Sequence, residues 1–172
     1  MKSFTKIEGL SLRSAEESDV TLIAEFVREL AEYERLSDAV TATEADYRST
    51  LFQEPRRAEV IIAELRGQPV AFALFFHNYS TFLAKPGLYL EDLFVKPEFR
   101  GRGYGGVILS YLAQLALDRG CGRFEWSVLD WNEPAIKFYK SLGAELLTDW
   151  TGNRVTGKAL EALASRYAAD EI

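Results

Sequence analysis

Residues 88–106 read LYLEDLFVKPEFRGRGYGG, and this stretch decides the fold. Its first part is mostly leucine, tyrosine, phenylalanine and valine, which predicts a strand over residues 88–95. A cluster of glycines then breaks the pattern, and a helix is predicted over residues 104–119, ended by Gly120. The stretch therefore predicts a strand, a glycine-rich turn and a helix in direct succession.

The glycine-rich turn, residues 100–106, has the composition of a phosphate site. Glycines let the backbone turn sharply and approach a ligand closely. The unpaired N–H groups and the positive dipole end of the following helix attract an anion. Arg100 and Arg102 add positive charge. We therefore expect this turn to bind a phosphate group and not to be a bare connection.

The spacing of the glycines leaves two kinds of phosphate ligand open. Gly101-x-Gly103-x-x-Gly106 formally matches the dinucleotide fingerprint. That fingerprint belongs to the first strand of a parallel sheet, whereas this turn comes late in the chain, after a predicted hairpin. Glu125 lies at about the distance of the expected acid, but near the start of its own strand. A nucleotide-dependent oxidoreductase is therefore the weaker alternative, and a P-loop is excluded because no Gly-Lys-Ser/Thr follows.

The hydrophobic pattern elsewhere predicts an α/β (α+β) domain. Strands are expected over 10–13, 59–65, 70–76 and 124–129, with a final strand pair over 145–150 and 154–156, and helices over 19–35, 43–52, 132–142 and 158–168. A hairpin meander followed by a β-α-β crossover implies a mixed, mostly antiparallel sheet of six to seven strands flanked by helices. No domain boundary is visible, so residues 1–172 are expected to form a single domain.

The composition excludes several classes of function. The net charge of −6, from 26 acids and 20 bases, gives no basic footprint for nucleic acid. One cysteine, Cys121, excludes an internal disulfide, and one histidine, His77, argues against a zinc site of histidines and cysteines, so no metal is expected. The chain shows neither a signal peptide nor a membrane helix, which favours a cytoplasmic protein.

Two motifs resemble a known family. Residues 95–105, VKPEFRGRGYG, resemble the acetyl-CoA-binding signature of the GNAT acetyltransferases, Q/R-x-x-G-x-G/A. Residues 132–144, NEPAIKFYKSLGA, are similar to the N-x-x-A-x-x-F-Y-x-x-x-G-F block of the same family. Residues 29–34, 89–95 and 131–134 look like the spermidine/spermine (diamine) N-acetyltransferase branch. The order of predicted elements also matches the GNAT fold.

The resemblance implies that acetyl-CoA is the cosubstrate. In the family, the loop amides hold the pyrophosphate, and a bulged strand pairs with the pantetheine arm and polarises the acetyl carbonyl. The residues implied to bind acetyl-CoA are Leu93, Phe94, Val95, Arg100, Gly101, Arg102, Gly103, Tyr104, Gly105, Gly106, Asn132, Ala135 and Tyr139. Asn132 has a second interpretation, since it is well placed to cap the helix that follows it.

Tyr139 and Glu91 are the expected catalytic residues. The resemblance makes Tyr139 the acid that protonates the departing thiolate. Glu91 and Asp92 interrupt an apolar strand, and strand alternation puts them on opposite faces. The resemblance assigns Glu91 to the substrate side, where it binds the ammonium group and accepts its proton. Asp92 is then expected to be structural.

The acceptor is expected to be a small basic amine: a polyamine, a diamine or a thialysine- or lysine-like amino acid. The residues implied to line its site are Tyr33, Glu34, Glu91, Glu125, Trp126 and Ser127. The segment 78–82 is poor in acids, which favours a shorter amine or an amino acid over a long polyamine. Acetyl transfer is expected by direct attack in a ternary complex.

Two alternatives use the same cofactor site. One is a CoA-binding sensor that has lost catalysis, although Glu91 and Tyr139 argue against it. The other is an acetyltransferase that acts on a protein or peptide amine, which the acidic charge of the chain also fits. The family resemblance further suggests a homodimer.

Overall fold

The computed structural model describes residues 2–167 of the chain. It divides into two compact units, Met1–Ser127 and Val128–Ile172, which we call the sheet unit and the C-terminal unit. The two units are described separately. None of the helices in the described part is long and apolar enough to span a membrane.

The sheet unit is built on one six-stranded sheet in the order β1-β2-β3-β4-β5-β6. Its strands are β1 (Lys2–Phe4), β2 (Leu10–Ser14), β3 (Glu59–Leu65), β4 (Gln68–Ser80), β5 (Lys85–Val95) and β6 (Phe124–Trp126). Neighbouring strands are antiparallel except for β5 and β6, which are parallel because α3 (Tyr104–Asp118) carries the chain back between them. This is the expected mixed, mostly antiparallel sheet.

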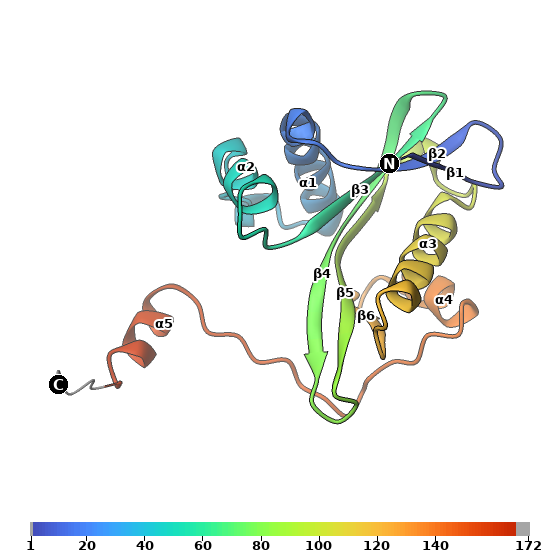
Figure 1. Cartoon of the computed structure of the whole chain (residues 1–172). Coiled ribbons are helices and arrows are strands. Elements are labelled where there is room, and N and C mark those ends of the chain that lie inside the picture. Colours follow the sequence, from blue (N-terminus) through green and yellow to red (C-terminus); the bar gives the residue numbers. More distant parts are fainter. Residues whose placement is uncertain (1, 168–172) are drawn as a thin grey trace. The chain divides into compact units, whose positions relative to one another are not determined.

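Helices cover both faces of the sheet (Figure 1). On one face, α1 (Val20–Glu34) and α2 (Glu44–Phe52) pack over the strands. The core there joins apolar residues at helical spacing on α1 to every second residue of the central strands; it contains Ile23, Phe26, Leu30, Leu51, Val60, Ile62, Phe72 and Phe94. On the other face, α3 packs against β4 and β5. We call these the α1 face and the α3 face.

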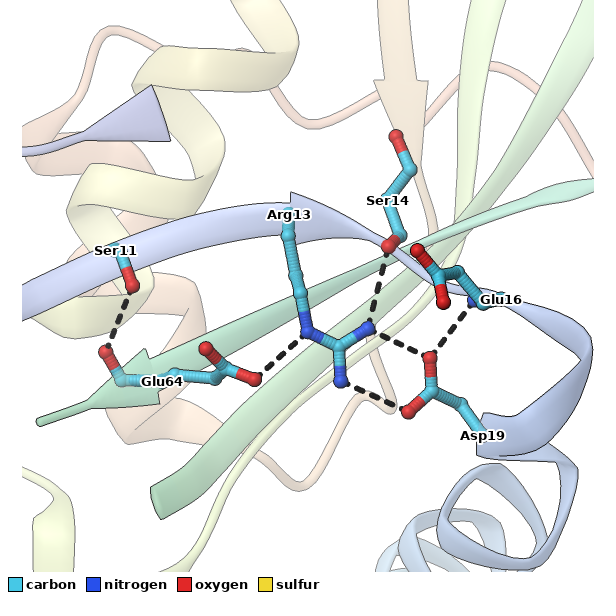
Figure 2. Close-up of polar contacts among 6 residues, drawn as sticks. All are labelled: Ser11, Arg13, Ser14, Glu16, Asp19 and Glu64. Carbon is cyan, nitrogen blue, oxygen red and sulfur yellow. Dashed lines mark hydrogen bonds and ion pairs between the residues drawn. The ribbon is translucent and has the colours of Figure 1, made fainter. Parts of the chain in front are cut away.

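A polar network ties the start of α1 to the sheet (Figure 2). Arg13 on β2 donates from Nη1 and Nη2 to Asp19 at 2.6 and 2.8 Å, and from Nε to Glu64 on β3 at 2.7 Å. Asp19 also accepts from the backbone N–H of Glu16 at 2.8 Å. The Arg13 contact holds the pKa of Asp19 below its ordinary value. The network therefore holds the N-terminal end of α1 against β2 and β3.

A β-bulge interrupts the pairing of β4 and β5. Leu74 pairs with Asp92, whereas Phe75 pairs with Leu90, so Glu91 is the extra residue. Leu74 packs against the core of the α1 face, which puts Asp92 on that face, while Leu90 lies on the α3 face opposite Phe75. The bulge therefore changes which way the side chains of β5 point at Glu91 and Asp92.

The C-terminal unit contains α4 (Glu133–Ser141) and α5 (Gly157–Ala164). The expected strand pair over 145–150 and 154–156 was wrong, because residues 128–167 contain no strand. Within this unit the apolar segment has no strand edge to pair with, and an isolated strand leaves its backbone groups without hydrogen-bond partners. The last residue of the predicted helix over 158–168 lies outside the described residues.

Strand limits also differ from the sequence-based expectation. β4 and β5 form a longer hairpin than predicted, and β6 is shorter than the predicted strand over 124–129. The short β1 was missed, because three residues carry too little periodicity to indicate a strand.

Candidate active site

The turn between β5 and α3 has the backbone geometry of an anion site. Gly101 and Gly103 have φ angles of +74° and +81°, which other residues adopt only with strain. The first hydrogen bond that enters α3 runs from Val107 N to Gly103 O at 3.1 Å. The amides of the preceding turn are therefore not used inside the helix and can bind phosphate oxygens.

The two arginines of this turn hold the loop itself. Arg100 donates from Nε to the carbonyl of Val95 at 2.9 Å, and its guanidinium lies 4.4 Å from the ring centroid of Tyr33 and 5.4 Å from that of Phe94. Arg102 donates from Nη2 to the carbonyl of Glu98 at 3.1 Å. The expected ionic contacts to phosphate would have to come from their remaining N–H groups.

The glycine-rich turn and the residues just before it also contact α1. Lys96 Nζ lies 3.6 Å from a carboxylate oxygen of Glu29 and 5.4 Å from the ring centroid of Phe26. Lys96 thus contacts Glu29, and Arg100 contacts Tyr33. The members of each pair of positions, 96 and 100 before and in the turn and 29 and 33 on α1, are four residues apart, and residues at that spacing lie on the same side of a helix. These contacts place the C-terminal end of α1, where Glu34 lies, beside the glycine-rich turn.

Three carboxylates gather on the α1 face near the bulge. The pKa of Asp92 is raised to about 6, first by burial and then by the negative charges of Glu91 and Glu34. Burial also raises the pKa of Glu34. Glu91 itself is exposed. The negative charges of Glu34 and Glu91 that act on Asp92 favour the approach of a positively charged group.

The expectation that Glu91 and Asp92 lie on opposite faces was wrong. Alternation predicted that Glu91 and Asp92 lie on opposite faces and that Asp92 is structural. The bulge breaks that alternation. Glu91 lies two residues from Tyr89, which contacts Phe76 on the α1 face, so Glu91 is on that face. Asp92 lies two residues from Phe94, which belongs to the core of the same face. Both acids therefore lie on the α1 face, and the structural role expected for Asp92 stays a prediction.

Sequence reasoning missed Tyr47, which lies on α2 near this cluster. Burial raises its pKa first, and the charge of Asp92 raises it further, while Arg28 lowers it. Its sequence signal is weak, because the pattern of a short helix does not distinguish a functional aromatic residue from a core one. Asp92 had a clear signal, an acid inside an apolar strand.

The expected acceptor residues divide into two groups. Tyr33 and Glu34 are the last two residues of α1, and Glu34 is one of the three carboxylates near the bulge. Glu125, Trp126 and Ser127 lie on and just after β6, where Glu125 pairs in register with Tyr89 and Trp126 with Leu90. Glu125 is engaged with Asn78 and Arg123, at 2.9 and 2.8 Å.

Several expected cofactor residues have packed side chains. Phe94 and Tyr104 are buried at 3% and 5% exposure, while Leu93 and Val95 are partly buried. The side chains of Phe94 and Tyr104 belong to the core, so at these two positions only the backbone groups are available to a ligand. Gly105 and Gly106 lie in the first turn of α3.

The remaining expected residues belong to the C-terminal unit. Asn132 caps α4, since its side chain accepts from Ala135 N at 3.4 Å. Tyr139 lies within α4, partly buried, with its ring centroid 5.5 Å from that of Phe138. The capping interpretation of Asn132 is therefore correct. In the described part of the chain, no group of three or more His, Cys, Asp or Glu side chains is arranged to hold a metal.

Comparison with known proteins agrees with this architecture. The family model described as Acetyltransferase (GNAT) family matches residues 23–144. Thialysine N-epsilon-acetyltransferase of Sus scrofa is 41% identical over 90% of this chain and 97% of its own length. L-ornithine N5-acetyltransferase of Arabidopsis thaliana is 32% identical over 88% of this chain and 86% of its own.

Solved structures show the same fold. An integron cassette protein from V. cholerae superposes with a TM-score of 0.78 at 29% identity, covering 92% of this chain and 99% of its own. An aminoglycoside acetyltransferase from a soil metagenome gives a TM-score of 0.72 at 17% identity, covering 86% and 97%. These matches replace the oxidoreductase alternative. The chain is an acyltransferase and belongs to the GNAT acetyltransferase family, in its diamine acetyltransferase branch.

Proposed function

We propose that this enzyme transfers an acetyl group from acetyl-CoA to the terminal amine of a small basic amino acid or diamine. The observation that carries the proposal is the acidic cluster of Glu34, Glu91 and Asp92 on the α1 face. Three carboxylates beside an anion-binding turn suit a cationic acceptor next to a phosphate-bearing donor. The named relatives act on amines, which supports the same assignment.

The residues present fit acetyl-CoA. The amides of residues 101–106 would hold its pyrophosphate. The edge of β5 at residues 93–95, which lies beyond the pairing of β5 with β6 at residues 88–90, would hold its pantetheine arm. Bound acetyl-CoA supplies an activated thioester. A backbone N–H of residues 93–95 would then donate to the oxygen of the reacting carbonyl, where negative charge develops.

The acids prepare the amine for attack. A protonated amine has no free lone pair, so a carboxylate must take its proton. Asp92, with a pKa of about 6, is closer to neutral pH than an ordinary aspartate and is suited to that task, while Glu91 anchors the ammonium group. Tyr139 would donate its phenolic proton to the leaving thiolate.

We further propose that both units act together as one acetyltransferase domain. The support is that the family model runs from residue 23 to residue 144, across the division between the units. The homodimer and the cytoplasmic location stay predictions.

The first experiment is a CoA-release assay with acetyl-CoA and a panel of acceptors. The panel holds L-thialysine, L-lysine, L-ornithine, cadaverine, putrescine, spermidine and a basic peptide. Saturable release with a small amine is expected. Release with the peptide alone would make the protein a peptide acetyltransferase, and CoA binding without any release would make it a sensor.

Variants connect the activity to the cluster. Glu91→Gln and Asp92→Asn are each expected to lower kcat/KM by about 10-fold to 1,000-fold, as loss of an acid–base or charged binding group does. Glu25→Gln is the matched control, because Glu25 is an exposed glutamate on the same helix as Glu34. If the cluster variants retain the activity of the control, the acceptor does not bind at these carboxylates.

A further inference from the structure

A second polar cluster lies at the far end of the β5 segment that carries Glu91. Glu125 accepts from Asn78 Nδ2 at 2.9 Å and forms an ion pair with Arg123 Nε at 2.8 Å. Arg123 also donates from Nη2 to the carbonyl of Tyr79 at 3.4 Å. We call Asn78, Arg123 and Glu125 the β6 cluster.

The β6 cluster lies against Gly87 of β5. A Cβ on Gly87 would be 2.2 Å from Asn78 Oδ1 and 3.0 Å from Arg123 Cγ, so a side chain at this position would displace both groups. Asn78 Oδ1 is buried without a hydrogen bond, and Arg123 Nε, also buried, has the ion pair to Glu125 as its contact. The inner side of the cluster is therefore closed by Gly87, and a ligand can reach it only through the exposed part of the Arg123 and Glu125 side chains.

This cluster is on the same face of the sheet as the acidic cluster. Asn78 is two residues from Phe76 on β4, so the two side chains are on the same face of the sheet. Phe76 contacts Tyr89 on the α1 face. Glu125 is the register partner of Tyr89, and Tyr89 Oη lies 2.8 Å from Ser127 Oγ, two residues farther along. Along β5, the α1 face therefore carries the acids Glu91 and Asp92 and, beyond Tyr89, the ion pair of Arg123 and Glu125.

The spacing of the two clusters suits a basic amino acid. Glu91 is two residues from Tyr89, which corresponds to about 7 Å along a strand. The terminal nitrogen and the α-carbon of an extended lysine are separated by five bonds of about 1.5 Å, which at tetrahedral angles span roughly 6 Å. An amine held at Glu91 and Asp92 thus puts the α-carbon of such a molecule level with Tyr89 and Glu125.

We propose that the β6 cluster binds the α-amino and α-carboxylate groups of the acceptor, so that the enzyme selects amino acids over diamines. Arg123 carries five N–H donors and its side chain is 36% exposed, so donors beyond its two contacts are open to a carboxylate. Glu125, at 25% exposure, is the partner for the α-ammonium group. This inference rests on the proposed function, since it takes the terminal amine to lie at the acidic cluster.

Arg28 is the competing cation on this face. It is exposed on α1, and its charge acts on Tyr47 together with that of Asp92. It therefore lies near the amine end of the site, where a carboxylate would be too close to the reacting nitrogen. The test must separate these two arginines.

The experiment compares two matched pairs of acceptors, L-lysine with cadaverine and L-ornithine with putrescine. The members of each pair differ only in the α-carboxylate. The ratio of kcat/KM for amino acid over diamine is measured for the wild-type enzyme and for Arg123→Gln, Arg123→Lys, Glu125→Gln and Arg28→Gln. Binding of the same four acceptors is measured by calorimetry, which reports on the site even where turnover is absent.

Arg123→Gln is expected to lower the ratio about 10-fold to 100-fold, the effect of one charge-assisted contact, while cadaverine turnover stays unchanged. Arg123→Lys should restore part of the ratio. Equal losses for both acceptors would mean that Arg123 is only structural, and a change of the ratio in Arg28→Gln alone would move the carboxylate site to α1. A wild-type enzyme that acetylates diamines as well as amino acids would also overturn this inference while leaving the proposed function intact. Absence of turnover and of binding for every amine would instead overturn the proposed function.

Discussion

Replacing Asp92 with asparagine is expected to stabilise the protein above about pH 6 while it lowers acetyl transfer. The carboxyl group of Asp92 is largely removed from water and lies beside Glu91 and Glu34, and these factors raise its pKa from 3.8 to about 6. A charge that the fold disfavours is a cost to stability, and it is retained where a site requires it. Asparagine keeps the shape and removes the charge.

The magnitude follows from the pKa of Asp92. A pKa raised from 3.8 to about 6 corresponds to about 3 kcal/mol against the ionised folded state, at about 1.4 kcal/mol for each pKa unit. Because the side chain keeps some contact with solvent, we expect a gain of about 1–3 kcal/mol.

The sign of the pH dependence is fixed by the direction of the shift. Below pH 3.8 the carboxyl group is protonated in both states, so its contribution is fully present. Between 3.8 and about 6 the unfolded chain releases the proton while the folded protein keeps it, so the stability of the wild-type protein falls as pH rises. The advantage of Asp92→Asn should therefore grow through this window and then stay constant.

Urea denaturation from about pH 4 to about pH 8 measures the difference, with unchanged m-values showing that the comparison is valid. Glu25→Gln, an exposed change of the same charge, is the control and should be neutral. In a Glu91→Gln background the gain from Asp92→Asn should shrink, because part of the repulsion has already been removed. An Asp92→Asn protein that is no more stable than the wild type at pH 8, or whose gain does not change with pH, would refute this reasoning.

Three further predictions concern other parts of the chain. Tyr139→Phe should lower turnover at least 10-fold and leave the affinity for acetyl-CoA within about 2-fold, as measured by single-turnover kinetics and calorimetry; unchanged turnover would remove Tyr139 from the mechanism. Arg100→Met should raise KM for the acceptor about 2-fold to 5-fold, because the exposed contact over the Tyr33 ring steadies the end of α1, whereas a larger effect on acetyl-CoA binding would make Arg100 a phosphate ligand. Asp19→Asn should destabilise the protein by about 1–3 kcal/mol at neutral pH. Since the pKa of Asp19 is lowered in the folded state, that loss should fade as pH falls below the ordinary value of 3.8, and a pH-independent loss in urea denaturation would contradict the role of the Arg13 ion pair.

The sequence by itself was sufficient for the fold class and for the local structure of the glycine-rich turn. Glycine spacing, positive φ and a helix start are local properties, so residues 101–106 could be assigned without knowledge of their surroundings. The same holds for the Asn132 cap, where a side chain bonds a backbone group three residues away. The strand pair expected over 145–150 and 154–156 failed for the opposite reason, because a strand needs a partner that the local pattern does not supply.

The acceptor side was decided by tertiary structure. Whether Glu91 and Asp92 share a face depends on one extra residue in the register between β4 and β5, and register is a property of two strands. The pKa of Asp92 depends on Glu34, which is 58 positions away in the chain and is brought near only when α1 packs on the sheet. The sequence by itself therefore determined the strand, glycine turn and helix in which a phosphate site is predicted. The packing of α1 on the bulged strand decided where three carboxylates meet, because charge repulsion and burial act through space and not along the chain.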